Sequence, residues 1–268
     1  EKPMAITVSE ADRMTAKARR QCLKLGVVFQ LRTSPLYREI KRLIENGELG
    51  HVYRVWMEAC VFRTQTYYDA DSWRGKWATE GGGVLINQVI HYVDLLQWLV
   101  GEPAELQGRI GTLFHNIEVE DIASATIHFE NGAHGVIQVS TLDLPEKVRF
   151  EICAEKGKII TEDDEAKRAV LGKPLQEYMS EAKVSSRPEI RWTGMKEERK
   201  SLGHSAVIKD FTEAILENRE PLVTGEDGRT SLEIVNAIIL SSFEKKNVSF
   251  PVDTRATLQR FMNCNYIF

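Results

Sequence analysis

The chain has 268 residues, of which 43% are hydrophobic and 28% are charged, an ordinary composition for a soluble globular protein. The formal net charge is -4, and Lys and Arg are scattered among Asp and Glu without forming a basic stripe, which argues against a nucleic-acid partner. No apolar run approaches the roughly 20 residues of a membrane span, and the first residues lack the apolar core of a signal peptide. We therefore expect a cytoplasmic protein that does not bind a membrane.

The cysteines lie far apart along the chain and show no paired C-x-x-C spacing. This spacing predicts neither a zinc site nor a disulfide framework, and we expect no metal site. Buried, reduced thiols are the simplest prediction for Cys22, Cys60, Cys153 and Cys264.

The first 48 residues predict a helix, a strand and a second helix. Ser9 is expected to cap a helix over residues 9–24. The apolar run 27–31 suits a buried parallel strand, and Ser34-Pro35 begins a helix that extends to about residue 46. This order of elements is typical of the end of a doubly wound sheet.

From residue 52 the hydrophobic period changes to two, which indicates strands. In the first strand Tyr53, Val55 and Met57 are expected to point to the covered face. Further strands are predicted over residues 106–114, 122–129, 133–141 and 148–154. Tight turns between consecutive strands favour a largely antiparallel sheet.

The two faces of this sheet differ in character. Residues 123, 125, 127 and 129 are apolar and are expected to face the helices. The opposite face is either exposed to solvent or half of a contact between two sheets. It is predicted to carry Ser124, Thr126, His128, Gln138, Ser140, Arg149 and Glu151.

Residues 161–203 are charged and weakly patterned, which predicts loops that could form a flap over a site. Helical patterns return over residues 205–217 and 228–245.

The stretch 81–98 is the most informative part of the chain. Its apolar residues recur at helical spacing, which predicts an amphipathic helix. Asn87 and His91 stand four residues apart, so both project from one side of such a helix, and Asp94 follows close to that side. The three glycines before it allow a ligand or another backbone to approach the helix N-terminus. The pattern predicts one wall of a binding site.

Three motifs together identify a family resemblance. They are Glu1-Lys2-Pro3, Trp73-Arg74-Gly75-Lys76-Trp77, and the glycine-led stretch 81–98. With these, the chain resembles the Gfo/Idh/MocA family of NAD(P)-dependent oxidoreductases, which act mostly on sugars, polyols and sugar derivatives. The similarity covers nearly the whole chain and includes the pattern of residues 204–211.

The resemblance implies a fold and a division into domains. In the family a Rossmann domain comes first, and Glu-Lys-Pro follows its fourth strand. Residues 1–48 would then be a remnant of the dinucleotide-binding domain, and residues 49–268 a substrate-binding and oligomerisation domain. The expected class is α/β (α+β), with an open, largely antiparallel sheet covered by helices on one face, preceded by the last helix, strand and helix of the Rossmann domain.

The resemblance also implies NAD or NADP as the cofactor. The chain contains no G-x-G-x-x-G turn to hold a dinucleotide pyrophosphate. We therefore expect this chain alone to bind NAD(P) weakly or not at all and to be inactive without a nucleotide-binding domain.

The resemblance assigns the catalytic role to His91, as the base that removes a hydroxyl proton. Lys2 would contact substrate and cofactor and place or polarise the reacting hydroxyl, or else be a solvated terminal residue. Asn87 stands where aspartate is common in the family, so it would bind substrate without adding charge. Asp94 either orients His91 or bridges nearby polar groups.

Five further residues are candidates by resemblance or by position. Trp73 and Arg74 resemble residues near the nicotinamide and the substrate, with helix packing as the alternative. Pro3 adjoins Lys2 on the cofactor side. Arg32 would end the predicted strand at its carboxyl edge, where doubly wound sheets bind ligands. His204 would either reach substrate or cap a helix.

Two functions from different classes follow. The first is an oxidoreductase that transfers hydride between NAD(P) and a hydroxyl carbon of a sugar-like small molecule. The second is a non-catalytic oligomerisation or sugar-binding module. Both are compatible with a homo-oligomer formed through the open face of the sheet.

Overall fold

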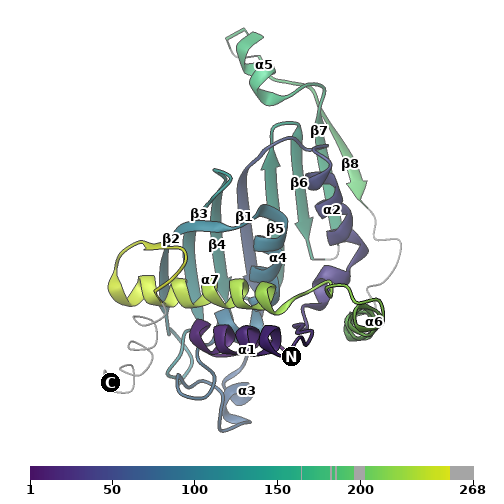
Figure 1. Cartoon of the computed structure of the whole chain (residues 1–268). Helices are drawn as coiled ribbons and strands as arrows, with labels where there is room; N and C mark the ends of the chain where they lie inside the picture. Colours follow the sequence, from purple (N-terminus) through teal and green to yellow (C-terminus); the bar gives the residue numbers. More distant parts are fainter. Residues whose placement is uncertain (164, 182, 185, 196–202, 254–268) are drawn as a thin grey trace.

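The computed structural model describes residues 1–163, 165–181, 183–184, 186–195 and 203–253, so Cys264 lies outside the described residues. Within them, one nine-stranded sheet forms the centre of the molecule (Figure 1). Its strand order is β8-β7-β6-β5-β1-β4-β3-β2-β9, with β1 and β4 parallel and all other neighbours antiparallel. The strands are β1 (Val52–Cys60), β2 (Pro103–Gly111), β3 (Ile122–Phe129), β4 (His134–Ser140), β5 (Lys147–Ala154), β6 (Gly157–Glu162), β7 (Glu165–Leu171), β8 (Ile190–Met195) and β9 (Val248–Ser249).

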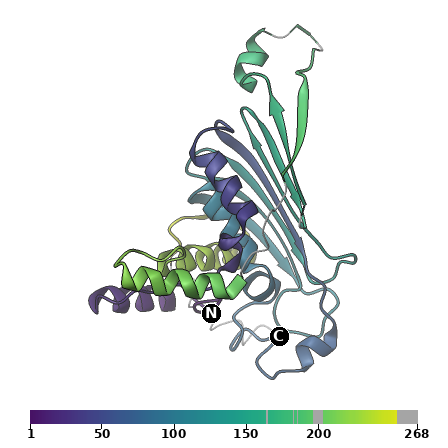
Figure 2. The same cartoon turned by 90° about the vertical axis from the view of Figure 1, so that its right-hand side faces the viewer.

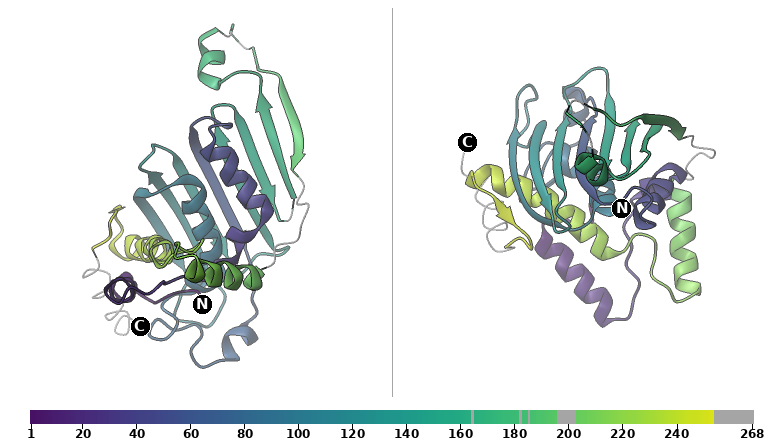
Figure 3. Two further views of the ribbon diagram at one scale, coloured as in Figure 1. Left: turned by 45° about the vertical axis from the view of Figure 1, so that its right-hand side comes forward. Right: turned by 90° about the horizontal axis from the view of Figure 1, so that it is seen from above.

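The helices that pack on the sheet lie on one face, and the opposite face is uncovered (Figure 2). In this helical layer α1 packs against α7, and α6 packs against η1 (Figure 3). The helical segments are α1 (Val8–Arg20), η1 (Gln30–Thr33), α2 (Pro35–Glu45), α3 (Gln65–Asp69), η2 (Val84–Gln88), α4 (Ile90–Val100), α5 (Leu175–Glu181), α6 (Gly203–Leu216) and α7 (Gly225–Glu244). The prediction of an α/β fold with an open, largely antiparallel sheet is confirmed.

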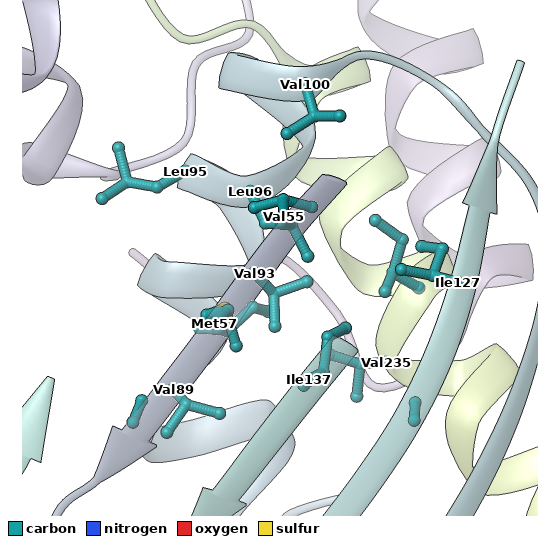
Figure 4. Packing of buried hydrophobic residues seen from close by; sticks show 14 of the residues in the cluster. Val55, Met57, Val89, Val93, Leu95, Leu96, Val100, Ile127, Ile137 and Val235 are labelled. Atoms are coloured by element: carbon teal, nitrogen blue, oxygen red, sulfur yellow. The ribbon is translucent and has the colours of Figure 1, made fainter. Parts of the chain in front are cut away.

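The core lies between the sheet and the helices α4 and α7 (Figure 4). Val93 and Leu96 of α4 are completely buried, as are Met57 of β1 and Val235 of α7. Burying one such side chain stabilises a fold by about 1.5–3 kcal/mol. The helix that follows Asn87 is therefore fixed against the sheet by its apolar side.

Of two predictions about strands, the structure confirms one and contradicts the other. In β3, residues 123, 125, 127 and 129 are buried against the helices as expected. In β1, Tyr53 is 40% exposed although it was expected to point inward. A β-bulge between Val52 and Arg54 shifts the register there, and a bulge places one extra residue out of the regular alternation.

The predicted strand over residues 27–31 is wrong. Residues 30–33 form the 3-10 helix η1 instead, and the preceding segment makes one isolated bridge, from Gly26 to Thr224. A β-strand is stable only when it pairs with neighbours. No described strand runs beside residues 27–31, although Val27 and Phe29 are buried in the core.

The predicted loop region 161–203 is also wrong over its described residues. Strands β7 and β8 lie there and extend the sheet, and helix α5 lies between them in the chain. The side chains of β8 are mostly exposed, so this edge strand has no buried face to produce an alternating pattern. Helix α1 begins two residues earlier than expected, because its N-cap is Thr7 and not Ser9, and Thr7 forms a capping box with Glu10.

A buried ion pair joins three helical segments. The Arg32 side chain, on η1, donates from Nε and Nη2 to the two carboxylate oxygens of Asp94, at 2.8 and 2.7 Å. Its Nη1 donates to Asp227 Oδ1 of α7, at 2.9 Å. Arg32 is 2% exposed and Asp94 is fully buried. Ser231 adds a hydrogen bond to Asp94, at 3.1 Å.

Replacing Arg32 by glutamine should destabilise the fold strongly. The change leaves the Asp94 carboxylate buried without its counter-ion, and breaking a buried pair in this way costs about 3–5 kcal/mol. Urea unfolding of the Arg32→Gln chain measures this loss. The control is Arg42→Gln, which removes an exposed pair with Glu39 and should change stability far less. Equal losses in the two variants would contradict a structural role for the buried pair.

Candidate active site

The stretch that carries Asn87 is not the continuous α-helix that its pattern predicts. Residues 84–88 form a π-helical turn, η2, and the α-helix α4 begins at Ile90. The wide turn is closed by a hydrogen bond from Val89 N to Val84 O, at 3.0 Å. A single π-helical turn inside a helix is frequent at functional sites. Asn87 therefore lies in an irregular turn, one step before the α-helix that carries His91.

Gly83 makes this turn possible. A Cβ at Gly83 would lie 2.0 Å from the backbone oxygen of Glu120, a distance at which no side chain fits. The Glu120 side chain then accepts hydrogen bonds from the backbone N–H groups of Gly83 and Leu85, at 2.8 and 3.0 Å. Sequence reasoning left these N–H groups open to a ligand, but the chain's own carboxylate already binds them. Burial raises the pKa of Glu120 to about 7.

Lys2 and Asn87 are joined directly. Lys2 Nζ donates to the backbone oxygen of Asn87 at 2.5 Å and lies 3.3 Å from its side-chain Oδ1. The Asn87 Nδ2 group donates to Glu80 Oε1 at 2.5 Å, and Gly75 N donates to Glu80 Oε2 at 2.6 Å. Lys2 is thus held in place, and the alternative of a freely solvated terminal residue does not fit these contacts.

Burial lowers the pKa of Lys2, and the positive charges of Arg63 and Arg74 lower it further, while Glu1 and Glu80 oppose them. Burial also raises the pKa of the Glu80 carboxyl. Sequence reasoning missed Glu80, because nothing in the spacing of residues 80 and 87 indicates that a tight turn brings them together.

His91 is largely buried at the same site. Its ring meets the edge of the Phe29 ring, with centroids 5.7 Å apart. Its Nδ1 atom is buried and has no hydrogen-bond partner among the residues that the structure describes. Burial, with smaller contributions from the charges of Lys2 and His204, lowers the pKa of His91 to about 4. The imidazole is therefore neutral at pH 7 and able to accept a proton.

Arg74 lies in an aromatic setting beside this group. Its guanidinium carbon lies 4.5 Å from the Trp73 ring centroid and 4.1 Å from that of Tyr67. Arg74 also donates to the Tyr67 hydroxyl, and its Nε donates to Asp71 at 2.9 Å. Gln88 donates to the same hydroxyl at 3.0 Å. Tyr67 follows β1 in the chain, and no periodic pattern in the sequence predicts its place here.

The remaining candidates divide into two groups. His204 is exposed, begins α6 and lies 3.9 Å from Glu1, close enough for its charge to act on His91. Pro3 is half-buried next to Lys2. Arg32 and Asp94 instead satisfy each other in the interior. Their geometry favours a structural role over the predicted cofactor contact and over an orienting contact from Asp94 to His91.

No cluster of three or more His, Cys, Asp or Glu side chains that could hold a metal ion occurs among the described residues. None of the helices formed by these residues is long and apolar enough to cross a membrane.

A sheet with helices on one face is also the fold of solved dehydrogenases. Residues 37–160 match the GFO/IDH/MocA C-terminal domain. The WlbA dehydrogenase from Bordetella pertussis, solved in complex with NADH and UDP-GlcNAcA, is 30% identical with a TM-score of 0.76, over 94% of this chain and 71% of that one. The chain belongs to the Gfo/Idh/MocA family.

Two other proteins are similar to this chain, one in sequence and one in fold. Myo-inositol 2-dehydrogenase from Thermotoga maritima is 25% identical over 256 residues, which cover 92% of this chain and 71% of the relative. Levoglucosan dehydrogenase, solved in complex with NADH, has a TM-score of 0.78 over 94% of this chain and 73% of its own, and at 22% identity it shows the shared fold alone. The chain thus spans part of the length of each of these relatives.

We predict that His91 stays neutral to unusually low pH because Lys2 adds its charge to the effect of burial. In the wild-type chain the His91 imidazole should still be neutral at pH 5.5, as measured by NMR of its ring nitrogens. In Lys2→Met, which keeps an apolar stem but removes the charge, the His91 pKa should rise. Lys158→Met, on the uncovered sheet face, is the control and should leave it unchanged. A His91 that is mostly protonated at pH 5.5 in the wild type would refute this prediction.

Proposed function

We propose that this chain forms the substrate side of a site that transfers hydride between NAD(P) and a hydroxyl carbon of a sugar, polyol or sugar derivative. The observation that carries the proposal is the group of Lys2, Asn87 and His91. It combines a neutral, buried imidazole with a lysine ammonium held by hydrogen bonds. A neutral imidazole can act as a general base, and an ammonium group stabilises the alkoxide that develops on the substrate. An inositol dehydrogenase and a D-apiose dehydrogenase among the relatives support the substrate class.

In this proposal the three residues have different tasks. His91 accepts the proton of the reacting hydroxyl. Lys2 places positive charge beside the oxygen that loses this proton, so the ammonium stabilises the negative charge that develops there. Asn87 holds Lys2 and presents an uncharged amide to the substrate. Nicotinamide, when bound, supplies the hydride acceptor.

The described residues fit one end of a dinucleotide better than the other. Lys2 and Arg74 lie together, and Trp73 is 41% exposed next to Arg74, so these three side chains and Pro3 would line the nicotinamide end. For the pyrophosphate, the described residues offer no glycine-rich turn between a strand and a helix. The donors of Arg32 are already bonded to Asp94 and Asp227.

We therefore propose that a separate nucleotide-binding domain completes the site and that this chain alone binds NAD(P) weakly or not at all. Residues 1–48 would belong to that domain and residues 49–268 to the substrate domain.

Exposed apolar side chains support a contact between this chain and the rest of the nucleotide-binding domain. They lie after α1 and along α6, and they are Leu23, Ile208, Ile215 and Leu216. Large apolar groups gathered on one surface commonly mark an interaction site.

We also propose that the protein is located in the cytoplasm.

Calorimetric titration of the chain with NAD⁺ tests the cofactor half of the proposal. We expect no binding at micromolar NAD⁺, and micromolar affinity would refute the need for a second domain. The catalytic half is tested by joining, ahead of Glu1, the part of the Thermotoga maritima relative that precedes its match to this chain, and measuring NAD⁺ reduction with inositols and hexoses. In that protein, His91→Gln should lower kcat by about 10²–10⁴-fold, the usual contribution of a general base.

His204→Gln is the matched control in the same protein, because His204 is exposed and lies at the rim of the site. It should lower kcat much less than His91→Gln. An unchanged kcat in His91→Gln would remove His91 from the mechanism, and turnover of no sugar or polyol by the joined protein would contradict the proposed activity.

We also propose that the chain forms a homo-oligomer through the uncovered face of the sheet. This face carries exposed apolar surface at Val136, 43% exposed on β4, next to Trp56 of β1, which β1–β4 pairing places directly opposite it. An exposed apolar patch on a sheet face favours association with another copy.

Sedimentation velocity tests whether this face contacts another copy of the chain or is exposed to solvent. The wild type should sediment as an oligomer, and Val136→Asp should dissociate it, because the contact would bury a charge. Leu23→Asp, on the opposite side of the molecule, is the control and should not dissociate it. A wild-type chain that is strictly monomeric at tens of micromolar would contradict this proposal.

A further inference from the structure

Three cationic side chains gather where Asn87 meets Lys2. The charges of Arg63 and Arg74 both act on Lys2, which bonds Asn87. The Tyr67 ring lies against both arginines, with its centroid 5.1 Å from the guanidinium carbon of Arg63 and 4.1 Å from that of Arg74. One aromatic ring thus fixes two guanidinium groups beside the proposed position of the substrate.

The acidic groups nearby do not fully satisfy these cations. Glu80 already accepts from Asn87 and Gly75. Asp71 takes one side of Arg74, through Nε. Among the described residues, the acid paired with Arg63 is Glu146, whose side chain is 55% exposed and lies 3.8 Å from Nη1, too long for a hydrogen bond.

Arg63 itself carries an unpaired donor. Its Nη1 donates to the backbone oxygen of Phe62 at 2.7 Å. Its Nε is buried and has no hydrogen-bond partner among the described residues. A buried charged donor without an acceptor is costly, and a ligand oxygen placed there would remove that cost.

Tyr67 adds a donor between the two arginines. Its hydroxyl oxygen accepts from Arg74 and from Gln88. A phenolic oxygen that accepts from two donors still has its own O–H to give, and the structure shows no acceptor for it in the described part of the chain. The three side chains together offer N–H and O–H donors around one position, with a net positive charge.

We propose that the substrate of this site is a sugar acid, whose carboxylate is bound by Arg63 and Arg74 with help from the Tyr67 hydroxyl. This rests on the proposed function, in which Lys2, Asn87 and His91 hold the hydroxyl that reacts. Planar guanidinium groups match the geometry of a carboxylate and bind it through paired hydrogen bonds. A phosphate is favoured by free N–H groups at a helix N-terminus, and here those of Gly83 and Leu85 already bond Glu120.

The test compares sugars that differ only in the carboxylate. The chain is titrated, by calorimetry and by ligand-observed NMR, with D-glucuronate and D-glucose, D-galacturonate and D-galactose, and D-mannuronate and D-mannose. At least one uronate should bind about tenfold or more tightly than its neutral partner, the effect expected of a charge-assisted hydrogen bond. Added salt should weaken the binding of that uronate and leave its partner unchanged.

Variants identify the residues responsible. Arg63→Gln should reduce the preference for the uronate to near unity, and Arg63→Lys should keep part of it. Arg109→Gln, on the distant strand β2, should keep all of it, and thermal unfolding checks that each variant is folded.

Equal binding within every pair, or preference for the neutral sugar, overturns the inference and leaves the proposed function standing. An Arg63→Gln variant that is folded and keeps the full preference also overturns it. Failure of all six sugars to bind counts against the substrate site itself, and therefore against both.

Discussion

The close approach of Gly83 to Glu120 is the constraint on which the site depends. Because residue 83 has no side chain, its backbone can pass the Glu120 carbonyl, and Val84 N donates to that oxygen at 3.0 Å. The Glu120 carboxylate accepts hydrogen bonds from the neighbouring backbone N–H groups of Gly83 and Leu85. A helix start needs partners for such groups, and a buried acid supplies them here. The position of Asn87 follows from this backbone contact and not from helical periodicity.

Burial controls the chemistry of the residues that the turn positions. The same removal from water lowers the pKa of His91 and of Lys2 and raises that of Glu80. Each shift favours the neutral form of its group. Charge is retained most strongly at the arginines, which do not lose their proton in this range. A site made of weakly basic groups beside permanently charged arginines can accept a proton and still attract an anion.

The sequence predicted those features that depend on local pattern. Alternation placed the buried face of β3 correctly, and Pro35 marked the start of α2. The wrong predictions concern features set by distant contacts. Tyr53 lies at a bulge, β8 has no buried face, and residues 27–31 have no described neighbouring strand to pair with. Hydrophobic periodicity reports one buried face, and these three segments do not have a regular one.

The site residues divide in the same way, into those that the sequence indicates and those that distant contacts position. The family resemblance predicted Lys2, Asn87 and His91 as site residues, and in the structure these three residues lie together. Glu80 and Tyr67 were missed, because their places depend on how a turn and a loop fold back on the motif. No periodic pattern encodes such contacts. Arg32 was named for its place at the end of an expected strand, and its real neighbours are two acids on helices that lie far away in the sequence.

Glu80 gives a physical reason for asparagine at position 87. The Asn87 amide donates from Nδ2 to Glu80 and presents its oxygen to Lys2. An aspartate at this position could face Lys2 equally well, but its second oxygen would lie against the buried Glu80 carboxylate. Two carboxylates so close cannot both be ionised without a large rise in the pKa of one of them. Asn87 avoids that conflict and leaves the positive charge of Lys2 and the arginines available to the substrate.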